Sequence, residues 1–367
     1  MTVMSEPLVD VRTDPKMLEA LRRIAPGTNM RQGINDILRG DLGALIVIGE
    51  PAELSFLFSG GIRLDQSFSP YLLYELAKMD GAIILNAMAT RIVYANVQLM
   101  PDPTIPSDET GTRHRTAERV AKQTGALVIS ISQQRDVVTL YVSDARYQLE
   151  EISDVLAKTN QAVTTLETYR VRFDQVSTRL TALEFQGAAM LDDVLVALQR
   201  AEMTSRMRSE IERNVVELGV EGRLIKIQLD EMSEWVPGDE VAMVRDYCLD
   251  EVAGGYGRAL EELHALPDSQ LLEIESLAEL LGYPRTISPV DHAVTPRGYR
   301  VLSKVPRLPD AVVAHVVTHF GTLEAFVRAS QGELEEVEGV GAVRAREIRE
   351  GLRRLQEQNL VDRYLNL

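Results

Sequence analysis

The sequence feature that most constrains the fold is a long central stretch without helix-breaking residues. No proline occurs between Pro106 and Pro237, and no glycine occurs between Gly125 and Gly187. Residues 144–230 are rich in Leu, Glu, Arg, Gln and Ala at helical spacing, and these residue types favour helices. The pattern predicts long helices, which could serve as an oligomerisation element or as a simple spacer bundle.

The chain before this stretch alternates between helical and strand patterns. The apolar run at residues 44–48, which ends in a Gly-Glu-Pro turn, indicates a buried strand. Such alternation predicts an α/β domain with a mixed sheet flanked by helices over residues 1–145. We expect helices at 15–24, 30–38, 70–78 and 115–123, and strands at 44–48, 82–85, 92–97, 126–132 and 137–142.

Several classes of site are excluded by what the sequence lacks. The dipeptide Gly-Lys does not occur, so there is no P-loop, and no GxGxxG motif follows a strand. Cys248 is the only cysteine, which rules out an intramolecular disulfide and a thiolate zinc site. His315 and His319 lie one helical turn apart, but no third ligand is near them in the sequence, so we interpret them as packing or surface residues.

A basic segment opens the helix expected near residue 115. Residues 111–116 read Gly-Thr-Arg-His-Arg-Thr. Thr112 or Thr116 can cap this helix, yet Arg113 and Arg115 place positive charge at the positive end of its dipole. The arrangement is unfavourable unless an anion binds there, and free backbone N–H groups with guanidinium groups form a strong polyphosphate site. The alternative is a basic surface turn whose arginines pair with nearby carboxylates.

A second candidate is the turn Asp80-Gly81-Ala82, which precedes an apolar strand. A carboxylate at the mouth of a strand can hold Mg²⁺ or Mn²⁺ against phosphates. Gly81 and Ala82 would let a nucleotide approach the backbone closely. The alternative is a helix end capped by glycine, which is common.

The tail carries a pattern typical of a helix-hairpin-helix. In residues 334–348, Gly339 and Gly341 flank Val340 between two helical segments. The glycines permit a tight hairpin whose N–H groups can bind successive phosphates, and such contacts hold the DNA backbone without reading bases. Glu338 stands where this pattern often has proline, and an acidic residue there weakens phosphate binding. The alternative is a helical hairpin used only for assembly.

The net charge of −16 argues against DNA binding, but the charge is unevenly distributed. Residues 301–367 carry 9 Lys and Arg against 10 Asp and Glu, so the acidic excess lies elsewhere. A local basic face matters more for phosphate binding than the total charge. Arg344 and Arg346, which follow the glycines, begin such a face.

Gly, Pro, Ser and Thr are frequent in residues 282–306, which predicts a linker. We therefore expect three domains: the α/β domain at 1–145, an all-α helical middle domain at 146–299, and a C-terminal helix-hairpin-helix domain at 300–367.

The N-terminus lacks the pattern of a signal peptide, and the longest apolar runs are too short to cross a bilayer. We expect an intracellular protein.

Taken together, these stretches resemble the diadenylate cyclase family. Segments 74–85, 95–99 and 111–122 carry the resemblance, which extends over most of residues 15–145. With its long helical middle and hairpin tail, the whole chain resembles the DNA-binding members of that family. The membrane-anchored members are similar only in the front domain.

The resemblance implies that two ATP condense to cyclic di-AMP and two pyrophosphates, between two facing domains that each hold one ATP. It implies that Asp80 is the catalytic residue and the ligand of Mg²⁺ or Mn²⁺. Phosphoryl transfer of this kind depends on positioning and charge neutralisation. The resemblance further implies that the ATP contacts come from Gly81, Ala82, Leu99, Thr112, Arg113, His114, Arg115, Thr116 and Ser132.

The partners that the resemblance implies are ATP, DNA and further copies of the chain. It implies a homo-octamer, binding to branched DNA without sequence preference, inhibition of synthesis by DNA, and a cytoplasmic, nucleoid-associated location. The DNA contacts would come from Gly339, Val340, Gly341, Arg344 and Arg346. An alternative hypothesis is a non-catalytic DNA-binding scaffold whose front domain only senses ATP.

Overall fold

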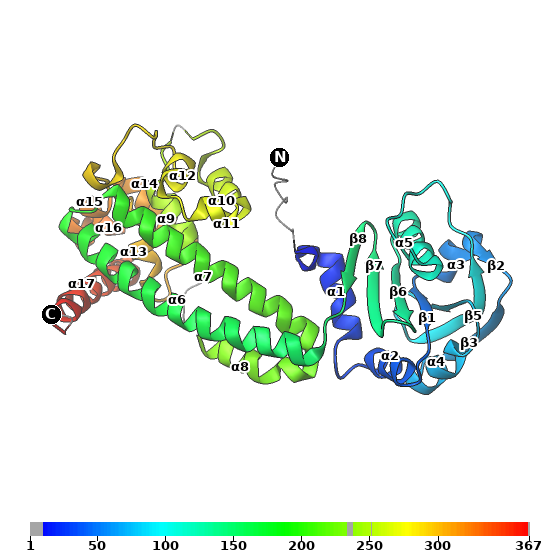
Figure 1. Cartoon of the computed structure of the whole chain (residues 1–367). Coiled ribbons are helices and arrows are strands. Elements are labelled where there is room, and N and C mark those ends of the chain that lie inside the picture. Colours follow the sequence, from blue (N-terminus) through cyan, green and yellow to red (C-terminus); the bar gives the residue numbers. More distant parts are fainter. Residues whose placement is uncertain (1–9, 233–237, 251, 366–367) are drawn as a thin grey trace. The chain divides into compact units, whose positions relative to one another are not determined.

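Figure 1 shows a computed structural model of the chain, which describes residues 10–232, 238–250 and 252–365. The chain divides into two compact units. The first comprises Met1–Val163 and Glu210–Glu231, and the second comprises Thr164–Ser209 and Met232–Leu367. Within the described ranges, no helix combines the length and the apolar character needed to cross a membrane.

The first unit is built on an eight-stranded mixed sheet. Its strand order is β2-β5-β4-β1-β6-β7-β8, and β3 pairs with β5 outside this path. The pair β1–β4 is parallel and the other pairs are antiparallel. The strands are β1 (Ala44–Ile48), β2 (Phe58–Ser59), β3 (Ile62–Ser67), β4 (Ala82–Leu85), β5 (Arg91–Leu99), β6 (Leu127–Ser132), β7 (Val137–Val142) and β8 (Ala145–Gln148).

Helices cover both faces of this sheet, as Figure 1 shows. The helices α1 (Pro15–Ile24), α2 (Asn29–Arg39) and α4 (Pro70–Ala77) share one core with the sheet, whereas α3 (Pro51–Leu54) and α5 (Thr112–Thr124) share the other. Successive side chains of a strand point to opposite faces. In β1, Ile46 and Ile48 therefore enter the first core and Leu45 and Val47 the second. The apolar run of β1 follows from this burial on both faces.

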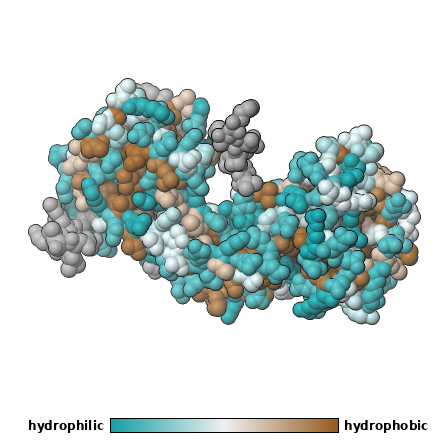
Figure 2. Space-filling model, viewed as in Figure 1, coloured by the Kyte–Doolittle hydropathy of each residue, from teal (hydrophilic) through white to brown (hydrophobic). Residues whose placement is uncertain are grey.

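The predicted α/β domain with a mixed sheet is confirmed. Figure 2 shows hydrophilic residues over much of the visible face of this domain. The expected helices and strands all occur, but β5 and α5 are longer than predicted, and α5 begins three residues earlier. The strands β2, β3 and β8 were not predicted.

The end of a long helix completes the first unit. Helix α7 (Leu191–Leu218) brings Asn214 and Glu217 to the sheet domain. The Arg12 Nη1 atom lies 2.6 Å from the Asn214 side-chain oxygen, and the Tyr147 hydroxyl donates to Glu217 over 2.8 Å. Tyr147 belongs to β8, so this strand is fixed by a segment about 70 residues further along the chain.

The second unit is helical, as the central stretch predicts. Helix α6 (Ile152–Gln186) and α7 are the long helices, although the chain from residue 145 first forms β8 and only then turns helical. The unit has two apolar cores. The shorter helices are α9 (Asp239–Tyr247), α10 (Gly255–Ala265), α11 (Asp268–Leu271), α12 (Ile274–Leu280), α13 (Tyr299–Ser303), α14 (Asp310–Phe320), α15 (Leu323–Arg328), α16 (Gln331–Glu335) and α17 (Ala342–Leu365).

The stretch expected to be a linker, residues 282–306, instead contains fully buried charge. Arg300 of α13 has no exposed side-chain area and forms a buried ion pair with Glu184 of α6. The carboxylate of Asp246 accepts the backbone N–H groups of residues 298–300 at 2.6, 2.6 and 2.9 Å and so caps α13. Glu184 also accepts the hydroxyl of Tyr247 over 2.6 Å. We call Glu184, Asp246, Tyr247 and Arg300 the buried ionic cluster.

Candidate functional site

Four strand ends meet at one edge of the sheet. β1 and β4 begin at this edge, and their antiparallel neighbours β6 and β5 end there. The structure thus brings together predicted site residues from separate segments of the sequence. They are Asp80 and Gly81 before β4, Leu99 at the end of β5, and Ser132 at the end of β6. We call this the Asp80 edge.

Gly81 is required by the backbone of the neighbouring strand. Its φ is +96°, and a Cβ atom there would lie 2.9 Å from the carbonyl carbon of Asn96. Asn96 itself has a φ of +51°, so two left-handed residues face each other beside Asp80. In a residue other than glycine, such as Asn96, this conformation costs energy, and such strained residues gather at functional sites. Helix α4 ends with Lys78 at its C-cap, so Gly81 does not cap that helix.

Asp80 presents a free carboxylate. The residue is exposed, and within the described ranges its side chain has no hydrogen-bond or ion-pair partner. The described residues include no group of three or more His, Cys, Asp or Glu side chains that could hold a metal by themselves. A single carboxylate suits Mg²⁺, which proteins commonly bind through one or two carboxylates together with substrate phosphates and water.

The first turn of α5 offers unpaired N–H groups at the same edge. The cap position is Gly111, which supplies no side-chain hydrogen bond, so the predicted threonine cap is wrong. Arg113 lies against Gly43, where a Cβ atom would come within 2.0 Å of the Arg113 Nη1 atom. The same nitrogen donates to the Ile131 carbonyl oxygen over 3.1 Å. Glycine at position 43 therefore makes room for the guanidinium group beside the ends of β1 and β6.

The positive charge at the start of α5 is not neutralised by carboxylates. Arg115 donates to the carbonyl oxygens of Glu109 and Thr110 over 3.3 and 3.4 Å. Neither Arg113 nor Arg115 forms an ion pair with a residue in the described part of the chain. The alternative of a basic turn paired with acidic neighbours is therefore not what the structure contains, and the site favours an anion.

His114, which lies between these arginines in the sequence, is fixed by hydrogen bonds that run through Tyr141 to Glu109. Its Nδ1 atom lies 2.9 Å from the hydroxyl oxygen of Tyr141 in β7. That hydroxyl donates to Glu109 over 2.8 Å, and the Nε atom of Arg146 lies 2.6 Å from the same Glu109 oxygen. Burial lowers the pKa of His114 below its usual range. No sequence motif marks Glu109 or Tyr141, and only their long-range contacts reveal them.

The remaining predicted contacts differ in what they can offer a ligand. Ala82 and Leu99 are buried in the core beneath α5, so Ala82 can face a ligand only through its backbone. Ser132 is half-buried and directly follows Ile131, whose carbonyl binds Arg113. Thr116 is half-buried one turn into α5, and Thr112 is exposed at its start.

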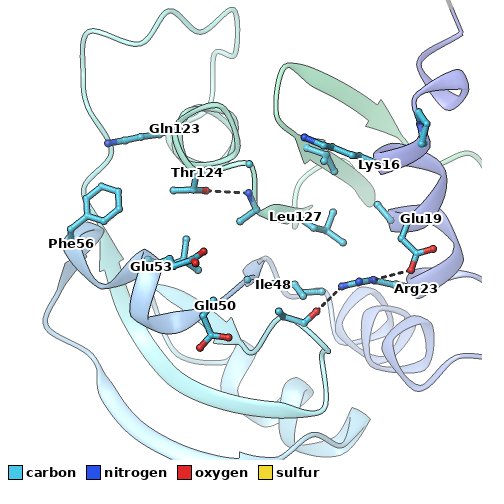
Figure 3. Close-up of a pocket in the computed structure, with 18 residues that line it drawn as sticks. Lys16, Glu19, Arg23, Ile48, Glu50, Glu53, Phe56, Gln123, Thr124 and Leu127 are labelled. Carbon is cyan, nitrogen blue, oxygen red and sulfur yellow. Dashed lines mark hydrogen bonds and ion pairs between the residues drawn. The ribbon is translucent and has the colours of Figure 1, made fainter.

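A cavity lies at the opposite edge of the sheet. Its volume is about 670 Å³, and Figure 3 shows Glu50 and Glu53 on one wall and Lys16 and Arg23 on the other. The C-terminal end of α5 also borders it, and that end carries the negative pole of the helix. Arg23 is already bound to Glu19 and to the Ala87 carbonyl oxygen. A polyphosphate is therefore better accommodated at the Asp80 edge, where Arg113 and Arg115 have no carboxylate partner in the described ranges and the cap residue of α5 supplies no side-chain hydrogen bond.

The tail forms a glycine turn between α16 and α17. Gly339 has a φ of +81°, and a Cβ atom at Gly341 would meet nothing within 4 Å. The side chain of Val340 is buried in the core of the tail, and its N–H donates to the Val337 carbonyl oxygen over 3.0 Å. Val340 thus anchors the turn and leaves the backbone of the glycines on the outside.

The two predicted arginines of the tail have different surroundings. Arg344 donates to the Gly339 carbonyl oxygen over 2.7 Å and so stabilises the turn. Arg346 is exposed on the first turns of α17. A second helical turn lies between α13 and α14, where Arg307 has a φ of +62° without being a glycine. These contacts define a helical hairpin with the exposed Arg346 beside it.

Comparisons with known proteins place these features in a family. The family described as "DisA bacterial checkpoint controller nucleotide-binding" matches residues 31–146, and "DisA bacterial checkpoint controller linker region" matches residues 149–289. The "DNA integrity scanning protein DisA" of Carboxydothermus hydrogenoformans is 50% identical over 94% of this chain and 98% of its own. Proteins with the same description from Clostridium acetobutylicum and Acidothermus cellulolyticus are 45% and 48% identical over 97% of this chain.

Proposed function

The chain belongs to the DisA family of DNA integrity scanning proteins, and from this premise we propose that it condenses two ATP into cyclic di-AMP and two pyrophosphates. The observation that carries the proposal is the meeting of a free carboxylate and an uncompensated cationic helix start at the Asp80 edge. A nucleoside triphosphate with a bound divalent cation has the complementary charges. The nucleotide-binding family match covers the same residues.

The proposed roles follow from the chemistry of each group. Arg113, Arg115 and the N–H groups of α5 hold the polyphosphate. Gly81 and Leu99 lie against the nucleoside. Asp80 holds Mg²⁺ or Mn²⁺, which when bound would neutralise charge on the phosphates and favour loss of the proton from the attacking hydroxyl.

The reaction is a displacement at phosphorus. The 3′-oxygen of one ATP forms a bond to the α-phosphorus of the other, the bond from that phosphorus to the bridging oxygen of pyrophosphate breaks, and the hydroxyl proton goes to solvent or base. The same displacement then occurs with the roles exchanged: the 3′-oxygen of the second ATP attacks the α-phosphorus of the first, and this second bond closes the ring. Positioning two reactants in line supplies most of the rate enhancement in such reactions.

One chain offers half of this arrangement, because each ATP must face another. We therefore propose that the active form is a homo-oligomer, in keeping with the octamer that the family resemblance implies. Turnover per chain should fall on dilution below the dissociation point of the assembly. Turnover strictly proportional to concentration, in samples that light scattering shows to be monomeric, would contradict it.

Anion-exchange chromatography of the purified full-length protein with ATP and Mn²⁺ tests the activity. Cyclic di-AMP and pyrophosphate should accumulate at one to two, and Asp80→Asn should give neither. ATP binding by calorimetry without any product from the wild-type protein would instead favour the ATP-sensing scaffold.

The tail is proposed to bind DNA as a helix-hairpin-helix without sequence preference. Support comes from the outward backbone of Gly339 and Gly341 and from the exposed Arg346. Such a turn neutralises few phosphates and does not enter the major groove, so base readout is not expected. Several tails presented together would favour branched DNA, because it can engage more than one tail at once. Inhibition of synthesis by that DNA and a location on the nucleoid are proposed from the family resemblance.

Point variants test this better than truncation, because removing the chain from residue 300 would also remove Arg300, the buried ion-pair partner of Glu184. Gly341→Val places a side chain in open space, so the fold should persist while the approach of a phosphate is blocked. We expect gel shifts with branched and linear DNA to weaken, and wild-type affinity to fall steeply with salt. The matched control is Arg353→Ala, which removes a charge from α17 that is paired with Glu357. Salt-insensitive binding, or a strong preference for one sequence, would contradict the proposal.

A further inference from the structure

We propose that Glu109 and Tyr141 are positioning residues that hold His114 with its hydrogen on Nδ1, so that Nε2 presents a lone pair to the nucleotide. This inference rests on the proposed function for the part that concerns the nucleotide. The three side chains come from three places in the chain: the loop before α5, α5 itself and β7. Their order in space is Glu109, Tyr141, His114.

Glu109 fixes the direction of the hydrogen bonds in this set. Its side chain is 17% exposed, and its Oε1 atom forms an ion pair with the Nε atom of Arg146 over 2.6 Å. An ionised carboxylate has no hydrogen to donate. The hydroxyl of Tyr141, 2.8 Å from the same oxygen, must therefore direct its only hydrogen toward Glu109.

Tyr141 then has only lone pairs to offer His114. The ring of Tyr141 is buried beneath α5, which limits alternative orientations of its hydroxyl group. The distance of 2.9 Å between the Tyr141 oxygen and the Nδ1 atom is that of a hydrogen bond. Because the oxygen accepts, Nδ1 must carry the hydrogen. In the neutral ring this leaves Nε2 without one.

Burial, together with three nearby cations, holds the pKa of His114 below its usual range and favours the neutral ring. Burial lowers the pKa of His114, and three cations lower it further: Arg146 from β8, Arg113 from α5 and Arg135 from the turn between β6 and β7. Glu109 acts in the opposite direction but does not overcome them. Burial and the bond to Glu109 also raise the pKa of Tyr141, which keeps its hydroxyl protonated.

A bare Nε2 cannot donate to a phosphate oxygen. Contact between His114 and the polyphosphate therefore requires that Nε2 first take up a proton, so nucleotide binding should be accompanied by proton uptake. The other neutral tautomer, which a free imidazole favours, would donate through Nε2 without a proton. Tyr141 and Glu109 thereby determine whether the contact between His114 and the polyphosphate depends on pH.

The test measures directly which ring nitrogen of His114 carries the hydrogen. Full-length protein labelled with ¹⁵N only at histidine has five labelled rings, and solid-state NMR of the protein with and without His114→Asn assigns the one of interest. In wild-type protein near neutral pH, with no nucleotide present, we expect the hydrogen on Nδ1. In Tyr141→Phe we expect it to move to Nε2, whereas Tyr94→Phe, which removes a hydroxyl from β5 of the same sheet, should change nothing.

Wild-type His114 with its hydrogen on Nε2 would overturn the proposal, whether or not Tyr141→Phe folds. Glu109→Gln provides a second perturbation, because the loss of the charge frees the Tyr141 hydrogen and should mix the two tautomers. The spectrum needs no ATP, so the outcome is separate from that of the proposed function. A cyclase with Nε2 protonated would refute this inference alone, and an inactive protein with Nδ1 protonated would refute only the function.

A calorimetric measurement tests the nucleotide part. The probe is 3′-deoxy-ATP, which lacks the attacking hydroxyl and cannot react, titrated in two buffers with different ionisation enthalpies. We expect the wild-type protein to take up part of a proton and Tyr141→Phe to take up less. Equal apparent enthalpies in both buffers for the wild-type protein would overturn the proton-coupled contact.

Discussion

The Asp80 edge and the buried ionic cluster differ in how their charges are satisfied. Charges at the edge are exposed and lack an ion-pair partner among the described residues, whereas charges in the cluster are buried and paired with one another. At the edge, Asp80 is exposed and has no partner among the described residues, and Arg113 donates to a carbonyl oxygen. In the cluster, Arg300 and Glu184 have no exposed side-chain area and are joined to each other. Asp246 is likewise buried and accepts three N–H groups.

This difference separates charges that serve the architecture from charges that serve a ligand. A buried charge without a partner is costly, so a fold that keeps one must satisfy it internally. An exposed cation at a helix start gains nothing from the dipole. Its retention there makes sense only if another molecule supplies the opposite charge. The comparison predicts that variants at the two places will affect different measurements.

Asp80→Asn should have the largest effect, and only on catalysis. Loss of a metal carboxylate removes several kcal/mol of charge stabilisation, which corresponds to a fall in turnover on the order of 1,000-fold. The melting temperature should not fall, since Asp80 has no partner in the described chain. Asp144→Asn, an exposed carboxylate in the turn between β7 and β8, is the control. Near-wild-type turnover of Asp80→Asn at saturating Mn²⁺ would remove the metal-ligand role.

Arg300→Met should have the complementary effect, on stability alone. It leaves the buried Glu184 carboxyl without its ion-pair partner, which typically costs about 3–5 kcal/mol. Urea unfolding should show a lower midpoint for the second unit, while the ATP affinity of the folded protein stays unchanged. The pair Arg300→Met with Glu184→Gln should recover part of the loss. A single variant as stable as the wild type would show that the cluster is not structural.

Replacing Arg113 and Arg115 together by alanine should weaken ATP binding by a smaller factor. Hydrogen bonds to charged groups contribute about 1.5–3 kcal/mol when buried, and exposure reduces this, so we expect a loss of roughly 30-fold in affinity. The melting temperature of the protein without ATP should stay the same or rise, because the arginines oppose the helix dipole. Arg22→Ala with Arg39→Ala removes the same charge elsewhere in the unit. An unchanged ATP affinity by calorimetry would show that the polyphosphate does not bind at the start of α5.

The smallest effect concerns pH. Burial holds the pKa of His114 below its usual range, so the unfolded chain binds a proton more readily once the pH falls below about 6.5. Stability from the neutral ring is present above that pH and is lost on acidification. The free energy of unfolding of the wild type should therefore fall relative to that of His114→Gln between about pH 7 and about pH 5. A constant difference would show that His114 titrates as freely as in the unfolded chain.

The apolar strands and the amphipathic helices could be predicted because burial leaves a periodic pattern in the sequence. In β1 all five residues are buried, so its run is continuous. Strand β3 gives no such signal, because five of its six residues are exposed and it lies at the margin of the sheet. Strand β8 has its polar Tyr147 fixed by Glu217, a partner that sequence spacing cannot reveal.

The candidate site could be predicted in part, for a similar reason. Asp80, Gly81 and the residues around Arg113 lie in short motifs, whereas Tyr141 belongs to an ordinary apolar strand and meets His114 only through tertiary structure. The threonine cap was wrong because the helix begins with Gly111 at its cap position. Arg300 lies in a stretch rich in glycine and proline, and nothing local indicates that it is buried.

The division of α6 and α7 between the two units has a consequence for biosynthesis. The first unit needs residues 210–231, so the ribosome must make 231 of the 367 residues before this unit can close. At about 5–20 residues per second, β8 waits on the order of ten seconds after its synthesis for Glu217 to arrive. During that interval the nascent sheet domain lacks its final partner and is exposed to chaperones and proteases. Translation speed across α6 and α7 therefore helps to set how much of the nucleotide-binding unit survives to assemble.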